Sequence, residues 1–251
     1  MVAAGQDPKR VDWLRERLAE IRGRIDEACH RAGRDPAGVR IVGVTKYVDA
    51  ESAACLLAAG CVDLGESRPQ SLWEKAAALE TQGMQPRWHL VGHLQRNKLR
   101  RTLPLLDLLH TLDSERLLAA AAEEAQRVGR PLQALVEVNL AGLPGRSGVA
   151  PEDVAGLVAA AAGGPVHVRG LMGMASRPDA DAGSAADPRR EFAILRECLA
   201  AVRREVDDPA SLVELSMGMS GDFEAAVLEG ATTVRIGSLL WEGWESPPGT
   251  A

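Results

Sequence analysis

The sequence has few aromatic residues, few lysines and no long apolar run. Phenylalanine, tryptophan and tyrosine together make up 3% of its 251 residues, so a folded core must consist mainly of Ala, Leu and Val. No segment approaches the roughly 18 consecutive apolar residues of a membrane-spanning helix, and the N-terminus lacks the apolar stretch of a signal peptide. These absences predict a cytoplasmic protein with no membrane partner.

Cysteine is also scarce, and the charge balance is acidic. The four cysteines show no CxxC pair and no metal-ligand spacing, so we interpret them as reduced core residues and predict no metal site. A net charge of −6 argues against a general nucleic-acid binder.

Helical and strand-like patterns alternate along most of the chain. Apolar residues recur at helical spacing over 8–32. Eight strand-like segments follow, at 40–45, 62–65, 88–92, 108–111, 133–139, 166–172, 212–217 and 232–236. Helical patterns lie between and after them, at 50–59, 68–82, 95–106, 114–128, 151–162, 188–206, 222–229 and briefly after 238.

This alternation is typical of parallel strands joined by right-handed helical crossovers. Eight units of this kind predict an α/β fold, a single (β/α)8 TIM-type barrel with an extra N-terminal helix. A doubly wound open sheet is the competing fold, but the glycine-rich loop typical of its first strand is missing from "TKYVDAE". We therefore expect one domain over 1–251, with disordered tails at 1–7 and 245–251.

The first strand-like segment ends unusually, on Lys46. The chain has four lysines and twenty-five arginines, so a plain surface cation here would more often be arginine. Lys46 is either a strand-end lysine that extends to solvent or an amine with a chemical task. In a cavity of low polarity its pKa would fall, and the neutral amine would become a nucleophile toward aldehydes.

Small polar residues close the last two strands, where barrels often bind phosphate. Ser220, Gly237 and Ser238 could offer hydroxyl and backbone N–H donors to an anion. Alternatively, Ser220 caps the following helix, and Gly237 with Ser238 forms a plain turn. An aldehyde-reactive lysine with a phosphate site across the same barrel mouth describes pyridoxal 5′-phosphate.

Two further residues are candidates for the same mouth. Arg235 interrupts the apolar strand "TTVRIGS", and there a cation could face the pyridine nitrogen and keep that ring unprotonated. The alternative for Arg235 is a buried ion pair with Glu137 or Glu214. His89 is either a hydrogen-bonded strand histidine or a pocket residue, whereas we interpret His93, His110 and His167 as structural.

With these residues assembled, the sequence resembles the pyridoxal phosphate homeostasis proteins, which are small relatives of the alanine racemase barrel. The resemblance runs from about 40 to 243. It is carried by "VTK" at 44–46, "LGESRPQS" at 64–71, "WHLVGHLQRNK" at 88–98, "VNLAGLPGRSGV" at 138–149, "RGLMGM" at 169–174, "LSMGMSGDFEAAV" at 215–227 and "VRIGSLLWEG" at 234–243.

The resemblance implies a cofactor site without catalytic residues. Lys46 matches the lysine that forms the covalent aldimine with pyridoxal 5′-phosphate, and Arg235 matches the arginine near the pyridine nitrogen. The remaining matches are the phosphate positions Ser220, Gly237 and Ser238 and the pocket-lining positions His89 and Met217. Ser67 is a further cofactor-binding candidate, although it stands where the family usually has asparagine, and Val48 replaces a second lysine of the family.

The resemblance also implies a function, which is to bind and supply the cofactor without an established reaction. The implied partners are the cofactor and pyridoxal-phosphate-dependent apo-enzymes. A racemase or decarboxylase with weak activity is the alternative, but racemases of this fold use a second base, a tyrosine, and the single tyrosine here is Tyr47. A role in protein–protein interaction is a third hypothesis. A closed barrel without free sheet edges predicts a monomer.

Overall fold

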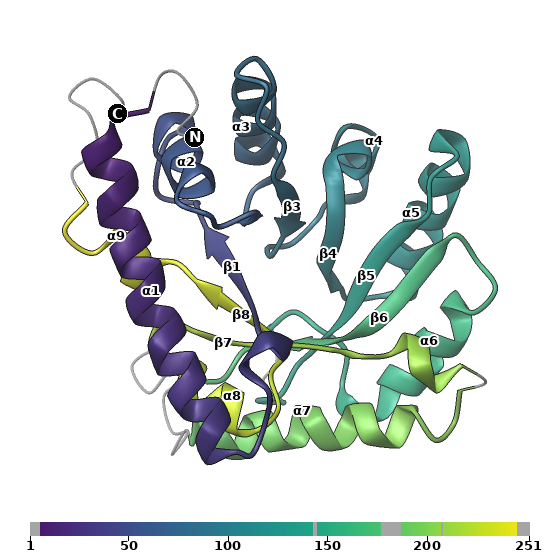
Figure 1. The fold of residues 1–251 in the computed structure, drawn as a ribbon. Helices are drawn as coiled ribbons and strands as arrows, with labels where there is room; N and C mark the ends of the chain where they lie inside the picture. The colour runs from purple at the N-terminus through teal and green to yellow at the C-terminus, as the bar shows by residue number, and fades with distance from the viewer. Residues whose placement is uncertain (1–5, 143–144, 177–186, 207, 245–251) are drawn as a thin grey trace.

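Eight parallel strands close into a barrel in the computed structural model, which describes residues 6–142, 145–176, 187–206 and 208–244 (Figure 1). The strands follow one another around the barrel in sequence order, and β1 pairs with both β2 and β8. They are β1 Arg40–Val44, β2 Asp63–Glu66, β3 Arg87–Leu90, β4 Leu106–Leu112, β5 Leu132–Val138, β6 Val166–Gly173, β7 Glu214–Met219 and β8 Thr233–Ile236. The predicted barrel is confirmed.

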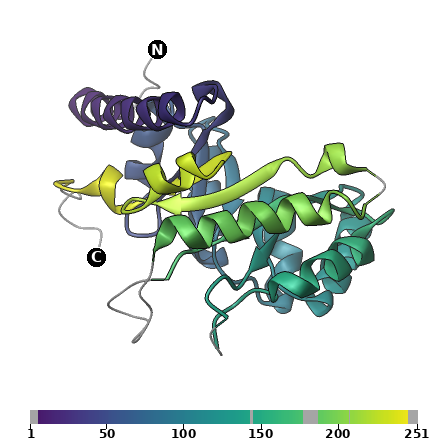
Figure 2. The ribbon, with the colours of Figure 1, turned by 90° about the horizontal axis from the view of Figure 1, so that it is seen from below.

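Helices surround this barrel, and a leading helix precedes it as predicted. The α-helices of the described residues are α1 Pro8–Arg31, α2 Ala50–Ala58, α3 Pro69–Glu80, α4 Leu99–Thr102, α5 Glu115–Val128, α6 Val154–Ala161, α7 Pro188–Val202, α8 Phe223–Leu228 and α9 Ser238–Trp241. The leading helix α1 packs against α2, α8 and α9, and Figure 2 shows it alongside the yellow C-terminal segment. It therefore covers the side of the barrel where the first and last strands meet.

The N-terminal tail is shorter than predicted. Residues 1–5 and 245–251 lie outside the described residues, but Gln6 and Asp7 belong to the fold. Gln6 is buried, and its Nε2 donates to Oε1 of Gln82 at 2.9 Å. The Asp7 side chain accepts from the backbone N–H of Lys9 and caps α1. Two polar contacts therefore fix residues that the composition alone assigned to the tail.

The helix predicted over 95–106 is wrong in detail. A 3-10 turn at Arg96–Lys98 leads into the single turn of α4, and a second 3-10 turn follows at Leu103–Leu105. Pro104 lies in that second turn and has no backbone N–H to continue an α-helical ladder. The apolar spacing was helical, but the proline interrupts the hydrogen bonding.

Two apolar groups and one polar group make up the interior. The larger apolar core lies between the strands and the helices, and a small cluster of Leu108, Leu135 and Met172 is separate from it. Polar side chains from five strands form a hydrogen-bonded chain beside the small cluster. The barrel lumen is therefore only partly apolar.

Candidate functional site

The carboxyl ends of the parallel strands meet at one mouth of the barrel, and Lys46 lies there in the turn after β1. Its side chain is exposed, and Nζ lies 4.7 Å from the centre of the Tyr47 ring. A cavity of low polarity, which we expected around this amine, does not enclose it. The reason is position, because β1 ends at Val44 and Lys46 is two residues beyond it.

A buried polar cluster supports the backbone that carries Lys46. Thr45 and Glu66 are fully buried, and Oγ1 of Thr45 donates to Oε1 of Glu66 at 2.7 Å. Lys75 extends from α3, forms a short ion pair with Glu66, and donates from Nζ to the Thr45 carbonyl at 2.6 Å. The cluster therefore holds the residue directly before Lys46. We did not assign Lys75 from the sequence, although a lysine nine residues after a strand-end glutamate was visible there.

Ser220 links the end of β7 to the segment that follows β8. Its Oγ accepts backbone N–H groups from Gly237 and Leu239, each at 3.2 Å. The serine therefore caps α9, whereas α8 follows Asp222, so the alternative in which Ser220 caps that earlier helix is wrong. Ser238 is exposed as the first residue of α9. Ser220, Gly237 and Ser238 thus lie together, and their contact with a phosphate stays a prediction.

The order of strands places this group beside Lys46 and not across the mouth from it. In the closed barrel β7 neighbours β8, and β8 neighbours β1. A hydrogen bond also links the segment after β8 to the end of β1, because Nε1 of the Trp241 indole donates to the Val44 carbonyl at 2.8 Å. Segments almost two hundred residues apart in the chain therefore form one side of the mouth.

Arg235 is buried and points into the lumen. Its Nη1 donates to Oγ of Ser216 at 2.7 Å and to the Ser216 carbonyl at 2.8 Å, and Nη2 donates to the Gly173 carbonyl at 3.0 Å. Burial lowers the pKa of Arg235 to about 10, so the guanidinium still carries its charge at neutral pH. The hydrogen bonds fix this cation below the mouth.

The predicted alternative, an ion pair between Arg235 and a glutamate, is wrong. Glu214 pairs with Arg40 at 3.3 Å, and Glu137 accepts a hydrogen bond from Ser147 at 2.6 Å. Burial also raises the pKa of Glu137. Within the described residues, neither carboxylate forms an ion pair with Arg235.

His89 belongs to a buried chain that runs from Arg235 down the lumen. His110 Nδ1 lies 2.9 Å from Oγ of Ser216, and His110 Nε2 lies 2.9 Å from His89 Nδ1. His89 Nε2 lies 2.9 Å from Oδ1 of Asp63. We interpreted His110 as structural, and no local pattern indicates that Asp63 and Ser216 would join it.

The two ends of this hydrogen-bond chain have fixed directions. Arg235 can only donate, so Ser216 accepts from it, and the Asp63 carboxylate can only accept, so His89 donates to it from Nε2–H. Each of the two contacts between these ends, His89 to His110 and His110 to Ser216, holds one proton, and the tautomer of each ring decides which atom donates it.

The carboxylate at the far end stays ionised. Burial alone would raise the pKa of Asp63, but the hydrogen bonds from His89 and Arg87 outweigh it and hold that pKa below its ordinary value. Arg87 binds Asp63 through two parallel bonds, Nε to Oδ1 at 2.8 Å and Nη2 to Oδ2 at 2.6 Å. The hydrogen-bond chain therefore has a fixed cation, Arg235, at one end and a fixed anion, Asp63, at the other.

Met217 and Ser67 lie at different depths. Met217 is fully buried in the larger core, and strand alternation turns it away from the lumen that the preceding residue Ser216 faces. Ser67 is partly buried at the end of β2, and its carbonyl lies where a Cβ on Gly92 would be. Contact of either residue with a cofactor stays a prediction.

The buried His110 predicts a loss of stability in mild acid. Burial, with a smaller contribution from His89, lowers the pKa of His110 well below its ordinary value. The folded state therefore resists a proton that the unfolded chain takes up near pH 6.5, and the resulting stability is lost as the pH falls below that value. We expect the unfolding free energy to fall by up to about 1.4 kcal/mol per pH unit in this range.

Urea denaturation between pH 7.5 and 5 measures this slope. His110→Gln cannot titrate, so its unfolding free energy should fall less steeply with acid than that of the unmodified protein. The matched variant is His30→Gln, because His30 is exposed. Equal slopes in all three proteins would contradict the assignment.

Two other kinds of site are not seen in the described part of the chain. It contains no helix both long and apolar enough to span a membrane. The same residues hold no cluster of three or more His, Cys, Asp or Glu side chains suited to a metal ion.

Comparison with known proteins gives consistent matches over nearly the whole barrel. The family model of the alanine racemase N-terminal domain matches residues 17–243. The chain is 37% identical over 232 residues to the pyridoxal phosphate homeostasis protein of Pseudomonas aeruginosa, covering 92% of this chain and 96% of that protein. It is 32% identical over 242 residues to the human protein of the same name, covering 89% and 84%.

A solved structure gives the same result. The structure of PipY of Synechococcus elongatus, determined with pyridoxal phosphate bound, is 32% identical in sequence and has a TM-score of 0.76. The match covers 90% of this chain and 99% of that one. Sequence and fold agree over the same residues, and the resemblance seen in the sequence is confirmed. The chain therefore belongs to the pyridoxal phosphate homeostasis proteins, within the family defined by the alanine racemase N-terminal domain.

Proposed function

We propose that this chain binds pyridoxal 5′-phosphate at the barrel mouth, holds it as a Schiff base on Lys46, and keeps it available in the cytoplasm. The observation that supports this most directly is the adjacency of β7, β8 and β1. These strands lead into Ser220, Gly237 and Lys46, which together offer phosphate donors and a primary amine. PipY, solved with this cofactor, and the homeostasis proteins named above support the same function.

The group around Ser220 fits a phosphate. Two backbone N–H groups, of Gly237 and Leu239, converge on a single oxygen, Oγ of Ser220, and a phosphate oxygen would share these donors with it or take its place. Ser220 keeps its own hydroxyl proton for donation while its oxygen accepts these two bonds. The exposed hydroxyl of Ser238 is the next donor along the chain.

Lys46 supplies a group that arginine cannot. When bound, pyridoxal phosphate supplies an aldehyde that condenses with a primary amine and a ring that accepts electrons. Nζ of Lys46 is exposed to solvent, so both the arrival and the departure of the aldehyde are open to water. This exposure supports reversible storage over permanent retention.

Arg235 would oppose protonation of the ring nitrogen. Its guanidinium is held by Ser216 and Gly173 and keeps its charge, and a proton beside a fixed cation is unfavourable. The ring is then a weaker electron sink than one facing a carboxylate. We propose that His89 acts through this arginine, because both of its ring nitrogens have protein partners.

We propose that the chain catalyses no reaction of its own. The two lumen histidines are committed to the buried chain, and Tyr47 is 73% exposed beside the lysine that would have to be the first base. A racemase or decarboxylase needs a second acid–base group on the other face of the substrate. Incubation with L-amino acids in D2O, followed by NMR, tests this, because sustained exchange of the α-proton would favour the enzyme.

The binding mode is tested by titrating the purified chain with pyridoxal 5′-phosphate and following the visible Schiff-base band. Borohydride then reduces the imine, and peptide mass spectrometry locates the label. We expect the label on the peptide that contains Lys46. A label distributed over Lys9, Lys75 and Lys98, or no band at all, would contradict the proposal.

Delivery is tested separately, by mixing the loaded chain with a pyridoxal-phosphate-dependent apo-enzyme and measuring recovery of its activity. Recovery faster than with the same concentration of free cofactor would support direct transfer to apo-enzymes. We also propose a monomer, since the closed barrel leaves no strand edge for pairing, and light scattering on the eluted protein measures its mass.

A further inference from the structure

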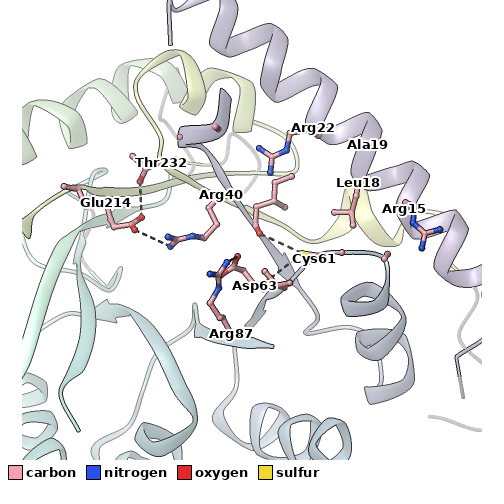
Figure 3. A pocket seen from close by; sticks show the side chains of 17 residues that line it. Arg15, Leu18, Ala19, Arg22, Arg40, Cys61, Asp63, Arg87, Glu214 and Thr232 are labelled. Carbon is pink, nitrogen blue, oxygen red and sulfur yellow. Dashed lines mark hydrogen bonds and ion pairs between the residues drawn. The ribbon is translucent and has the colours of Figure 1, made fainter. Parts of the chain in front are cut away.

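A second hollow lies at the end of the barrel opposite the mouth. Its volume is about 770 Å³, and it is lined by α1, by the short turn Pro36–Gly38, and by the starts of β1, β2, β3 and β7 (Figure 3). Pockets of this size hold small molecules. None of the predicted cofactor residues lines it, so it is separate in space from the site at the mouth.

The lining is positively charged in an acidic protein. Four arginines line the hollow, Arg15, Arg22, Arg40 and Arg87, against one aspartate and one glutamate. The chain as a whole carries a net charge of −6. In Figure 3 the side chains of Arg22, Arg40 and Arg87 lie around the same space. Arg15, Arg40 and Arg87 pair with the carboxylates of Asp12, Glu214 and Asp63, whereas Arg22 bonds the neutral Val39 carbonyl, so Arg22 supplies the excess positive charge. A positive group at a concave site favours an anionic ligand.

The arginines are held in place and still have donors to offer. Nη1 of Arg22 donates to the Val39 carbonyl at 2.7 Å, and Nη1 of Arg40 pairs with Glu214 at 3.3 Å. The other oxygen of Glu214 accepts from Thr232 at 3.1 Å, which fixes that carboxylate. A guanidinium has five N–H donors, so a single bond at each leaves a fork for a ligand.

The remaining polar groups that line the hollow suit it for binding a ligand and not for catalysing a reaction. Burial raises the pKa of Cys61 to about 12, so its thiol is neutral and unreactive. Asp63 is engaged by Arg87 and His89 and cannot act as a free base. Among the lining residues no nucleophile or general base remains available.

The apolar part of the lining indicates the kind of uncharged body to which the anionic group of the ligand is attached. No aromatic side chain is among the lining residues, so a flat ring would find nothing to stack on. Val62 and Val213 are among the few large apolar residues that stay exposed, at 46% and 41%, and both line the hollow. Leu18 and Ile41 also line it. A short aliphatic or sugar-like body suits this surface.

We propose that this hollow binds a small phosphate monoester with a non-aromatic body, and that Arg22 and Arg40 hold the phosphate. Planar guanidinium forks match the oxygens of a phosphate in pairs. The fork of Arg87 is taken by Asp63, so Arg22 and Arg40 hold the phosphate.

Calorimetric titration with glycerol 3-phosphate tests the proposal on the full chain. We expect binding that weakens at least about tenfold in Arg22→Gln and in Arg40→Gln, the equivalent of about 1.4 kcal/mol. Arg40→Lys keeps the ion pair with Glu214 but loses the fork, so it too should weaken binding while its thermal unfolding stays close to that of the unmodified protein.

Ser220→Ala is the matched control, because it alters the phosphate cradle at the mouth and leaves the hollow intact. Binding that survives in Ser220→Ala supports the second site. Binding that is lost in Ser220→Ala but kept in Arg22→Gln would overturn it, and so would the absence of binding. Succinate is titrated in parallel, and tighter binding of this dicarboxylate than of the phosphate ester would overturn the ligand class.

Discussion

Replacing Lys46 by arginine should abolish the visible absorption band that we expect the chain to develop with pyridoxal 5′-phosphate. Arginine keeps the positive charge and most of the length at an exposed position, so the fold should be unaffected. A guanidinium stays protonated at neutral pH and forms no stable imine with an aldehyde. We expect the apparent Kd for the cofactor to rise by about 100-fold or more, which corresponds to about 2.7 kcal/mol.

Absorbance and equilibrium dialysis measure the two effects separately, because the cradle around Ser220 can still bind the phosphate when the covalent bond is gone. Lys98→Arg is the matched control, since Lys98 is partly exposed in a surface turn and should keep both the band and the affinity. A band of full intensity in Lys46→Arg would assign the covalent bond to another lysine.

Replacing Lys75 by methionine should cause a large loss of stability. The change leaves Glu66 fully buried without its cation, and the Thr45 carbonyl keeps only the backbone N–H of Val48 of its two donors. Breaking a buried pair from one side costs about 3–5 kcal/mol, because the remaining charge is desolvated and uncompensated. Urea denaturation should report a decrease of this size in the free energy of unfolding.

The double variant Lys75→Met with Glu66→Leu separates the pair from the volume of the side chain. Since it removes both charges together, it should recover most of the loss. Lys9→Met is the surface control, because Lys9 is exposed in the first turn of α1 and its replacement should change stability by less than about 0.5 kcal/mol. A loss below about 1 kcal/mol in Lys75→Met would show that the cluster contributes little.

Local patterns predicted the barrel well, and the reason is physical. Strand and helix alternation is a property of neighbouring residues, and parallel strands leave few arrangements for eight such units. The errors fell where a single residue or contact overrides the pattern. Pro104 interrupted the helix expected over 95–106, and Gln6 was fixed by Gln82 although its neighbours look like a tail.

The site was predicted less completely. Its individual groups, Lys46, Ser220, Gly237 and Arg235, could be found because each is out of place in its own segment. Their contacts could not, because Ser220 bonds across to residues beyond β8, and Arg235 bonds to strands β6 and β7. His110 and Lys75 look ordinary in sequence and gain their roles from residues distant in the chain.

The sequence by itself therefore determined the class of fold and the family, and it indicated a candidate amine and candidate phosphate donors, since these depend on local spacing and on short motifs. Only the tertiary structure decided that the candidate donors lie beside Lys46, that the lysine is exposed, and that a hydrogen-bond chain runs from Arg235 to Asp63. It alone brought the arginines together at the other end of the barrel. Barrel closure is the cause, because the pairing of β1 with β8 brings the first and the last strand of the sequence side by side.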